Sequence, residues 1–193
     1  LDISPTDAML AQWKTEAAAL ASQNPLYRLS EAGGKSRNYP PAVGTAEFRA
    51  VAADHFTKET GIEGVTAKDI IAHSGGKGVL NLVGRQFKRG DKVLVAGPGW
   101  PSNYDIWRDG VEIIEVDTKG RGLMTTAQLR QALTDHPDAK ALLLNDPCNP
   151  TGARYTPEER EAVMEVLHEH HKTNASFLTV TDDPYGALAY GGA

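Results

Sequence analysis

The chain has 193 residues, of which 40% are hydrophobic and 23% are charged, and its net charge is −5 at pH 7. This length is enough for one sizeable hydrophobic core and leaves little room for a second compact domain. The acidic balance argues against nucleic acid or a membrane surface as a partner, and no apolar stretch approaches the roughly 20 residues that span a bilayer. Cys148 is the single cysteine and no signal peptide is visible, so we expect a cytoplasmic protein.

The first sixty residues predict two helices separated by a loop. Residues 8–22 are rich in alanine and are followed by Asn24-Pro25, a pattern typical of a helix and its end. The adjacent prolines at positions 40 and 41 favour an extended path. Thr45 is a good N-cap for a second helix. The apolar residues of this helix fall on one face: Phe48, Val51, Ala52 and Phe56.

From about residue 65 the pattern alternates between strands and helices. The strand candidates are residues 70–73, 92–96, 112–116, 141–144 and 177–181, and the helix candidates are residues 77–87, 126–134 and 157–170. Thr156, Pro157 and Glu159 form a capping box with proline in the first turn of the last helix. The central strands are short and apolar on both sides, which is typical of parallel strands covered on both faces. The sequence therefore predicts an α/β fold with a mainly parallel open sheet.

Two candidate ligand sites follow the strands at 70–73 and 92–96. Gly75, Gly76 and Lys77 precede a predicted helix, where glycines let the backbone approach a ligand and free N–H groups favour an anion. A tight turn without a ligand is the alternative for this segment. Trp100 lies among the turn residues 97–101 and can present a flat face to an aromatic ligand. Its alternative role is to cap the edge of the core.

Two further candidates follow the strands at 141–144 and 177–181. The Asn149 side chain can donate a hydrogen bond to a phenolate oxygen, although residues 149–152 also make a good turn without a ligand. Asp182 ends a buried strand, where a carboxylate is costly unless it is paired. Asp183 and Asp182 could instead cap the turn that leads to Tyr185. The six histidines show no metal-ligand spacing, so we expect no metal site.

Together, residues 145–152 and 180–188 resemble the cofactor-binding core of the fold-type I aminotransferases of class I/II, which depend on pyridoxal 5′-phosphate (PLP). The motif Asp-Asp-Pro-Tyr is similar to the one found in the branch of the family that acts on aromatic amino acids and α-aminoadipate. The resemblance implies transfer of an amino group from an amino acid to a 2-oxo acid. It also implies that residues 1–38 are an N-terminal helix and arm that contact the small domain or the dimer partner, and that residues 39–193 begin the PLP-binding large domain.

The resemblance further implies a role for each candidate residue. The cofactor-binding set is Gly75, Gly76, Lys77, Trp100, Asn149, Asp182, Tyr185 and Tyr39. In this set the glycine turn holds the phosphate, Trp100 stacks on the pyridine ring, and Asn149 and Tyr185 bind the 3-oxygen. Asp182 pairs with the pyridinium nitrogen, and Asp182 and Tyr185 are the catalytic residues. Tyr39 reaches the cofactor of the other subunit in a homodimer.

One family element has no counterpart here. The aldimine-forming lysine of the family lies well downstream of its Asp-x-x-Tyr element, and no lysine follows Lys172 in this chain. We therefore expect the front part of an aminotransferase, inactive by itself. The alternative function is a PLP-binding effector domain of a bacterial transcription regulator. Such proteins carry a winged-helix domain upstream, and here the first predicted helix begins at residue 8.

Overall fold

The computed structural model describes residues 6–23, 41–107 and 110–186. The chain divides into two compact units, Leu1–His73 and Ser74–Ala193. Both clusters of buried hydrophobic side chains belong to the second unit. No helix in the described part of the chain is long and apolar enough to cross a membrane.

The first unit contains the two predicted helices, α1 (Asp7–Gln23) and α2 (Ala46–Thr60). The Thr45 hydroxyl caps α2 by accepting a hydrogen bond from the backbone N–H of Phe48 at 3.2 Å. Gly61 ends the helix with a φ of 71°, a conformation that glycine adopts without strain. The N-cap prediction is therefore confirmed.

One sequence prediction for this unit is wrong. Residues 70–73 form no strand: Ala72 N donates to Val43 O at 2.9 Å, but among the described residues these positions take part in no ladder of such bonds. The second helix is present as predicted, and on its apolar side Phe48, Val51 and Phe56 are exposed within the described residues. Helical periodicity identified the helix correctly, but it could not tell whether an apolar face is covered.

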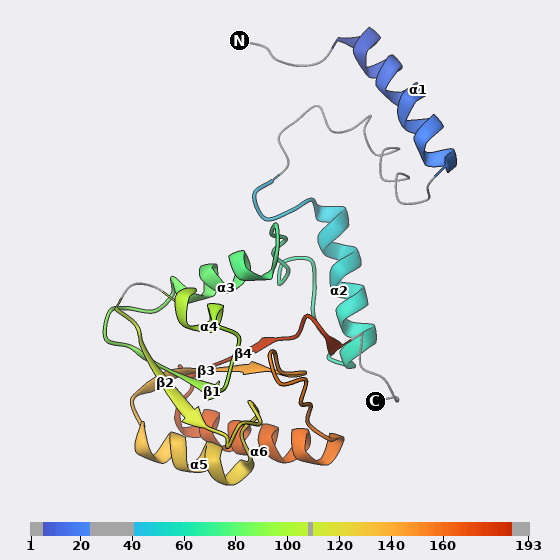
Figure 1. Cartoon of the computed structure of the whole chain (residues 1–193). Helices are drawn as coiled ribbons and strands as arrows, with labels where there is room; N and C mark the ends of the chain where they lie inside the picture. The colour runs from blue at the N-terminus through green and yellow to red at the C-terminus, as the bar shows by residue number, and fades with distance from the viewer. Residues whose placement is uncertain (1–5, 24–40, 108–109, 187–193) are drawn as a thin grey trace. The chain divides into compact units, whose positions relative to one another are not determined.

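The second unit is built on four parallel strands. They are β1 (Lys92–Gly97), β2 (Glu112–Asp117), β3 (Ala139–Asn145) and β4 (Leu178–Asp182). Their order in the sheet is β2-β1-β3-β4, and all three neighbouring pairs are parallel (Figure 1). The sequence prediction of a parallel open sheet is confirmed, together with all four of these strand positions.

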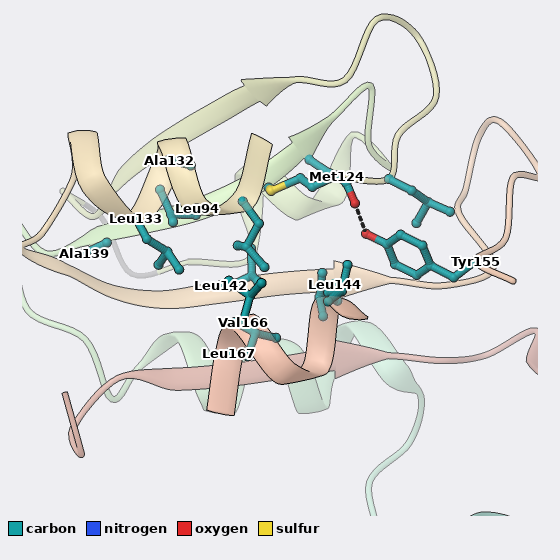
Figure 2. Packing of buried hydrophobic residues seen from close by; sticks show 14 of the residues in the cluster. Leu94, Met124, Ala132, Leu133, Ala139, Leu142, Leu144, Tyr155, Val166 and Leu167 are labelled. Carbon is teal, nitrogen blue, oxygen red and sulfur yellow. Dashed lines mark hydrogen bonds between the residues drawn. The ribbon is translucent and has the colours of Figure 1, made fainter. Parts of the chain in front are cut away.

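Helices cover both faces of this sheet, as the apolar strands predicted. On one face, α5 (Thr126–Asp135) and α6 (Pro157–Thr173) pack on Leu94 and Leu142, which are fully buried (Figure 2). On the other, α3 (Gly76–Gly84) and the short α4 (Ser102–Asp105) lie over a second cluster. The predicted helix 77–87 is shorter because Gln86 and Phe87 bond carbonyls three residues back, which forms a turn.

The start of α6 is fixed by the predicted capping box. The Thr156 hydroxyl accepts from Glu159 N at 3.2 Å, and the Glu159 carboxylate accepts from Thr156 N at 3.0 Å.

Because the strands run parallel, their carboxyl ends meet at one edge of the sheet. Asn145 at the end of β3 is the register partner of Asp182 at the end of β4. Ligands of open α/β sheets bind outside such an edge.

Candidate functional site

A pocket of about 210 Å³ lies at this carboxyl edge. Its lining comes from the start of α3, from the turn after β1 and from the ends of β3 and β4: Gly76, Lys77, Leu80, Trp100, Asn145, Asn149, Asp182, Pro184 and Tyr185. The structure thus brings together most of the residues that the sequence singled out, from four different segments. Gly75 is not among the lining residues and directly precedes Gly76 as the N-cap of α3. Tyr39 lies outside the described residues.

The glycine turn leaves open space at the beginning of α3. Gly75 is the N-cap, with a φ of 111° that L side chains rarely adopt. A Cβ atom at Gly76 would meet nothing within 4 Å, so packing within the protein does not require glycine there. The first turn of α3 contains no acidic residue. Gly76 and Lys77, the first two residues of α3, line the pocket, and the N-terminal end of a helix has the polarity that favours an anion.

Lys77 and Trp100 lie on the same side of the pocket. Lys77 Nζ donates to Ser102 Oγ at 3.0 Å and lies 6.0 Å from the centroid of the Trp100 ring. Trp100 is half-buried and packs against the buried cluster on the α3 face of the sheet. Trp100 therefore contacts the core, as the alternative interpretation expected, and it also lines the pocket; its stacking on an aromatic ligand stays a prediction.

A chain of hydrogen bonds joins the ends of β3 and β4. Asn145 Nδ2 donates to the backbone oxygen of Asp182 at 2.8 Å, and Asn145 Oδ1 accepts from the backbone N–H of Asn149 at 2.7 Å. Asn149 Nδ2 in turn donates to the Tyr185 hydroxyl at 3.3 Å. Asn149, Asp182 and Tyr185 therefore occupy one connected arrangement rather than three separate turns.

The two neighbouring carboxylates differ in their surroundings. Burial raises the pKa of Asp182, and the nearby charge of Asp183 raises it further. Among the described residues no cation lies against the Asp182 carboxylate. Asp183 Oδ1 accepts from Gly186 N at 2.7 Å, so the alternative role of capping the turn is correct for Asp183. Asp182 is left as a partly desolvated carboxyl group whose ionised form a cationic ligand group would stabilise.

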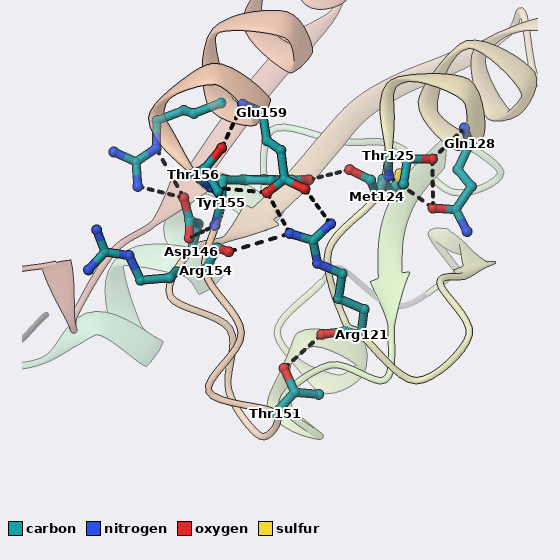
Figure 3. Close-up of polar contacts among 11 residues, drawn as sticks. Arg121, Met124, Thr125, Gln128, Asp146, Thr151, Arg154, Tyr155, Thr156 and Glu159 are labelled. Atoms are coloured by element: carbon teal, nitrogen blue, oxygen red, sulfur yellow. Dashed lines mark hydrogen bonds and ion pairs between the residues drawn. The ribbon is translucent and has the colours of Figure 1, made fainter. Parts of the chain in front are cut away.

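The loop that carries Asn149 is fixed from its other side by side-chain contacts that the sequence analysis did not predict (Figure 3). Arg121 forms a bidentate pair with Glu159 at 2.9 and 2.6 Å, and its backbone oxygen accepts from Thr151 Oγ1 at 2.7 Å. Arg160 binds the Asp146 carboxylate through Nε at 3.1 Å and Nη2 at 2.8 Å. These bonds tie residues 146–151 to the beginning of α6.

Sequence reasoning also gave no role to Asn145, although it belongs to the segment used for the resemblance. One signal could have found it. Asn145 is a polar residue at the end of an apolar strand, which is the same argument that selected Asp182. No group of three or more His, Cys, Asp or Glu side chains in the described ranges could hold a metal ion.

An open parallel α/β sheet with its pocket at the strand ends defines a class of ligand-binding enzyme folds. Within that class, residues 5–193 match the family model of aminotransferase class I and II, and the chain belongs to this family. It is 37% identical over 169 residues to the aspartate/prephenate aminotransferase of Thermus thermophilus, covering 86% of this chain and 42% of that protein. The aspartate aminotransferase of Geobacillus stearothermophilus is 31% identical over 158 residues, covering 80% of this chain and 38% of that protein.

The fold comparison agrees with the sequence comparison. A structure of the Thermus thermophilus aspartate aminotransferase with maleate matches with a TM-score of 0.70 and 33% identity. The match covers 94% of this chain and 44% of that one. The chain thus spans less than half the length of the relatives that it matches. The resemblance stated from the motifs to fold-type I aminotransferases, over their N-terminal portion, is confirmed.

Proposed function

We propose that the full-length protein uses PLP to transfer an amino group from an amino acid to a 2-oxo acid. One observation carries the proposal: one pocket combines an anion-favouring turn, an aromatic face and a partly buried carboxylate that has no cationic partner among the described residues. These are the groups that a phosphate, a pyridine ring and a pyridinium nitrogen require. Because the relatives are named aspartate or aspartate/prephenate aminotransferases, we propose aspartate as the amino donor.

The residues present fit the cofactor without rearrangement of the protein's own packing. The open space beside Gly76 admits a phosphate to the N–H groups at the start of α3. The Lys77 ammonium adds positive charge at the same end of the pocket. Trp100 gives a flat apolar surface for the ring. A cofactor that binds in this pocket would therefore replace water with backbone N–H donors, the Lys77 charge and the Trp100 ring, and the protein need not rearrange.

When bound, PLP supplies an electron sink for the charge left on the substrate after its α-proton is removed. The task of Asp182 is to keep a proton on the ring nitrogen. An adjacent pyridinium would lower the pKa that burial and Asp183 now raise, so the carboxylate would stay ionised. Asn149 and Tyr185 would both donate to one oxygen of the ring, and the contact between their side chains supports this role. Asp182 and Tyr185 are accordingly the proposed catalytic residues of this chain.

Other parts of the proposal concern the assembled protein. A homodimer in which Tyr39 reaches the cofactor of the other subunit, and a cytoplasmic location, follow from the family. No lysine follows Lys172, so the family's cofactor-binding lysine has no counterpart in these 193 residues. Without a base positioned to move the α-proton, the chain by itself should not turn over. The relatives reported above are enzymes, and no observation favours the regulator alternative.

The test is a titration with PLP followed by intrinsic fluorescence. The full-length protein should bind PLP with quenching of Trp100, and the resulting complex should convert aspartate and 2-oxoglutarate to their amino-transfer products. Trp100→Leu should weaken PLP binding and remove most of the quenching. Trp13→Leu is the matched control, since Trp13 lies on α1 of the other unit, and should bind like the unchanged protein. Absence of PLP binding in the unchanged protein would contradict the proposal.

A further inference from the structure

Asn145 is the one pocket residue whose two amide atoms are both engaged with other pocket segments of the described chain. It lies at the end of β3 and is 8% exposed. Its Nδ2 donates to the carbonyl of Asp182 and its Oδ1 accepts from the amide of Asn149. The bond to Asp182 extends the β3–β4 ladder by a side chain at the point where the two strands end.

This arrangement fixes one distance in the pocket. A planar amide holds its two hydrogen-bond partners at a constant separation, so the backbones of Asn149 and Asp182 cannot move apart without breaking a buried bond. The ties through Asp146 and Thr151 run to Arg160 and to the Arg121 carbonyl. They hold the loop after β3 and do not reach β4.

We propose that Asn145 is a positioning residue that sets the separation between the Asp182 carboxylate and the Asn149–Tyr185 pair. The inference rests on the proposed function. Its ligand class is a rigid heteroaromatic ring with a nitrogen at one position and an oxygen substituent at another, both of which must meet their partners at once. Because the ring cannot adapt, small changes of this separation weaken one contact or the other. Asn145 acts through Asn149 and Asp182 and does not touch the reacting atoms.

Asn81 offers a matched control on α3. Its Nδ2 donates to Ile106 O at 2.9 Å and its Oδ1 accepts from Arg85 Nε at 3.2 Å. It is a part-buried asparagine with the same number of amide bonds, and it does not line the pocket. Asn145→Ala and Asn81→Ala therefore remove comparable bonds from two different places.

The first measurement is hydrogen exchange of the Asn149 backbone amide in the full-length protein without PLP. Asn145→Ala should speed this exchange by about tenfold or more, as expected for the loss of a buried partner. Asn81→Ala should leave it unchanged. The second measurement is the dissociation constant for PLP, which should rise about tenfold in Asn145→Ala and stay the same in Asn81→Ala.

A third variant distinguishes positioning from general loss of structure. Asn145→Asp keeps the shape and the acceptor for Asn149 N–H, but it loses the donor to Asp182 O. It should keep slow exchange at Asn149 and still bind PLP more weakly. If Asn145→Ala does not fold, the PLP affinity of Asn145→Asp alone tests the positioning role. Equal PLP affinity in the unchanged protein, Asn145→Ala and Asn145→Asp would overturn the inference alone. Failure of the unchanged protein to bind PLP would overturn the proposed function and the inference with it.

Discussion

Asn149 and Tyr185 are 36 positions apart in the sequence, and the Asn149 side chain donates a hydrogen bond to the Tyr185 hydroxyl at 3.3 Å. The bond connects the loop after β3 to the turn after β4, which are neighbouring strands of the sheet. At 3.3 Å it is longer than the usual range for such bonds. Both groups can therefore turn their donors to a ligand oxygen at small cost.

This relationship predicts coupling between the two residues in ligand binding. Asn149→Ala and Tyr185→Phe should each weaken PLP binding, by about 0.5–1.5 kcal/mol for the loss of one hydrogen bond. Since we propose that both donate to one ligand oxygen, the double variant should differ from the sum of the singles by about 0.5 kcal/mol or more. A double-mutant cycle on the PLP dissociation constant measures the coupling. Strictly additive effects would show that the two side chains do not share a ligand atom.

We expect Tyr155, which lies away from the pocket, to contribute to the folding stability of the protein. Its hydroxyl donates to the Met124 carbonyl at 2.7 Å, and its side chain is 3% exposed (Figure 2). Tyr155→Phe leaves a buried carbonyl without its partner, which should lower the free energy of unfolding by about 1–3 kcal/mol. Denaturant unfolding measures this change. Tyr185→Phe, at an exposed tyrosine, is the control and should change the stability by less than about 0.5 kcal/mol.

The same tyrosine gives the protein an alkaline pH dependence. Burial raises the pKa of Tyr155 from 10.0 to about 12. The folded state therefore holds this proton more tightly than the unfolded state, and the free energy of unfolding should fall as the pH rises from 10 toward 12. Tyr155→Phe lacks this contribution, so its stability should fall less steeply over that interval. Parallel curves for the two proteins would contradict the assignment.

For Glu159 we expect the opposite pH dependence: its contribution to the free energy of unfolding is lost as the pH falls in the acid range. The Arg121 guanidinium lowers the pKa of this carboxyl below its ordinary value of 4.5, and the backbone N–H of Thr156 lowers it further. Its contribution to stability is therefore complete above pH 4.5 and is lost as the pH falls through the lower pKa of the folded state. In Glu159→Gln the melting temperature should depend less on pH below 4.5. Glu165→Gln, at an exposed glutamate of the same helix, should keep the original dependence.

Much of the fold follows from local signals that agree with one another. The central strands β1 and β3 are apolar runs, and Thr156 with Glu159 marks the beginning of α6. Residues 70–73 carry a similar apolar signal and form no strand, since a strand also needs a partner at the right distance. Ile71 is instead 58% exposed. Strand propensity reports side-chain fit to a sheet and cannot supply that partner.

The site was predictable as a set of residues but not as a geometry. Trp100 and Asp182 could be selected because each follows a strand end. The role of Asn145 depends on the β3–β4 register, which pairs it with Asp182, and on which way its amide points. The pair of Arg121 with Glu159 joins positions 38 apart. Such contacts come from packing of whole elements, and no short sequence pattern encodes them.

Asp182 should show a conflict between stability and ligand binding. Because its carboxylate is partly desolvated and faces the charge of Asp183, its pKa is raised above the ordinary value of 3.8. The folded state then holds the proton more tightly than the unfolded state, so this residue lowers the free energy of unfolding as the pH rises above 3.8. Asp182→Asn removes that charge. The ligand-free variant should be more stable than the unchanged protein at neutral pH, and the difference should vanish below pH 3.8.

The same substitution should weaken PLP binding, since an amide cannot form the charge-assisted bond to a ring N–H⁺. Loss of such a bond costs about 1.5–3 kcal/mol, which corresponds to a rise in the dissociation constant of about ten- to a hundredfold. Thermal unfolding without PLP and PLP titration at neutral pH measure the two effects on the same samples. Asp183→Asn is the control, because Asp183 caps the following turn through Gly186 N; it should leave PLP binding nearly unchanged. A variant of Asp182 that is both less stable and fully competent to bind PLP would show that this carboxylate is structural.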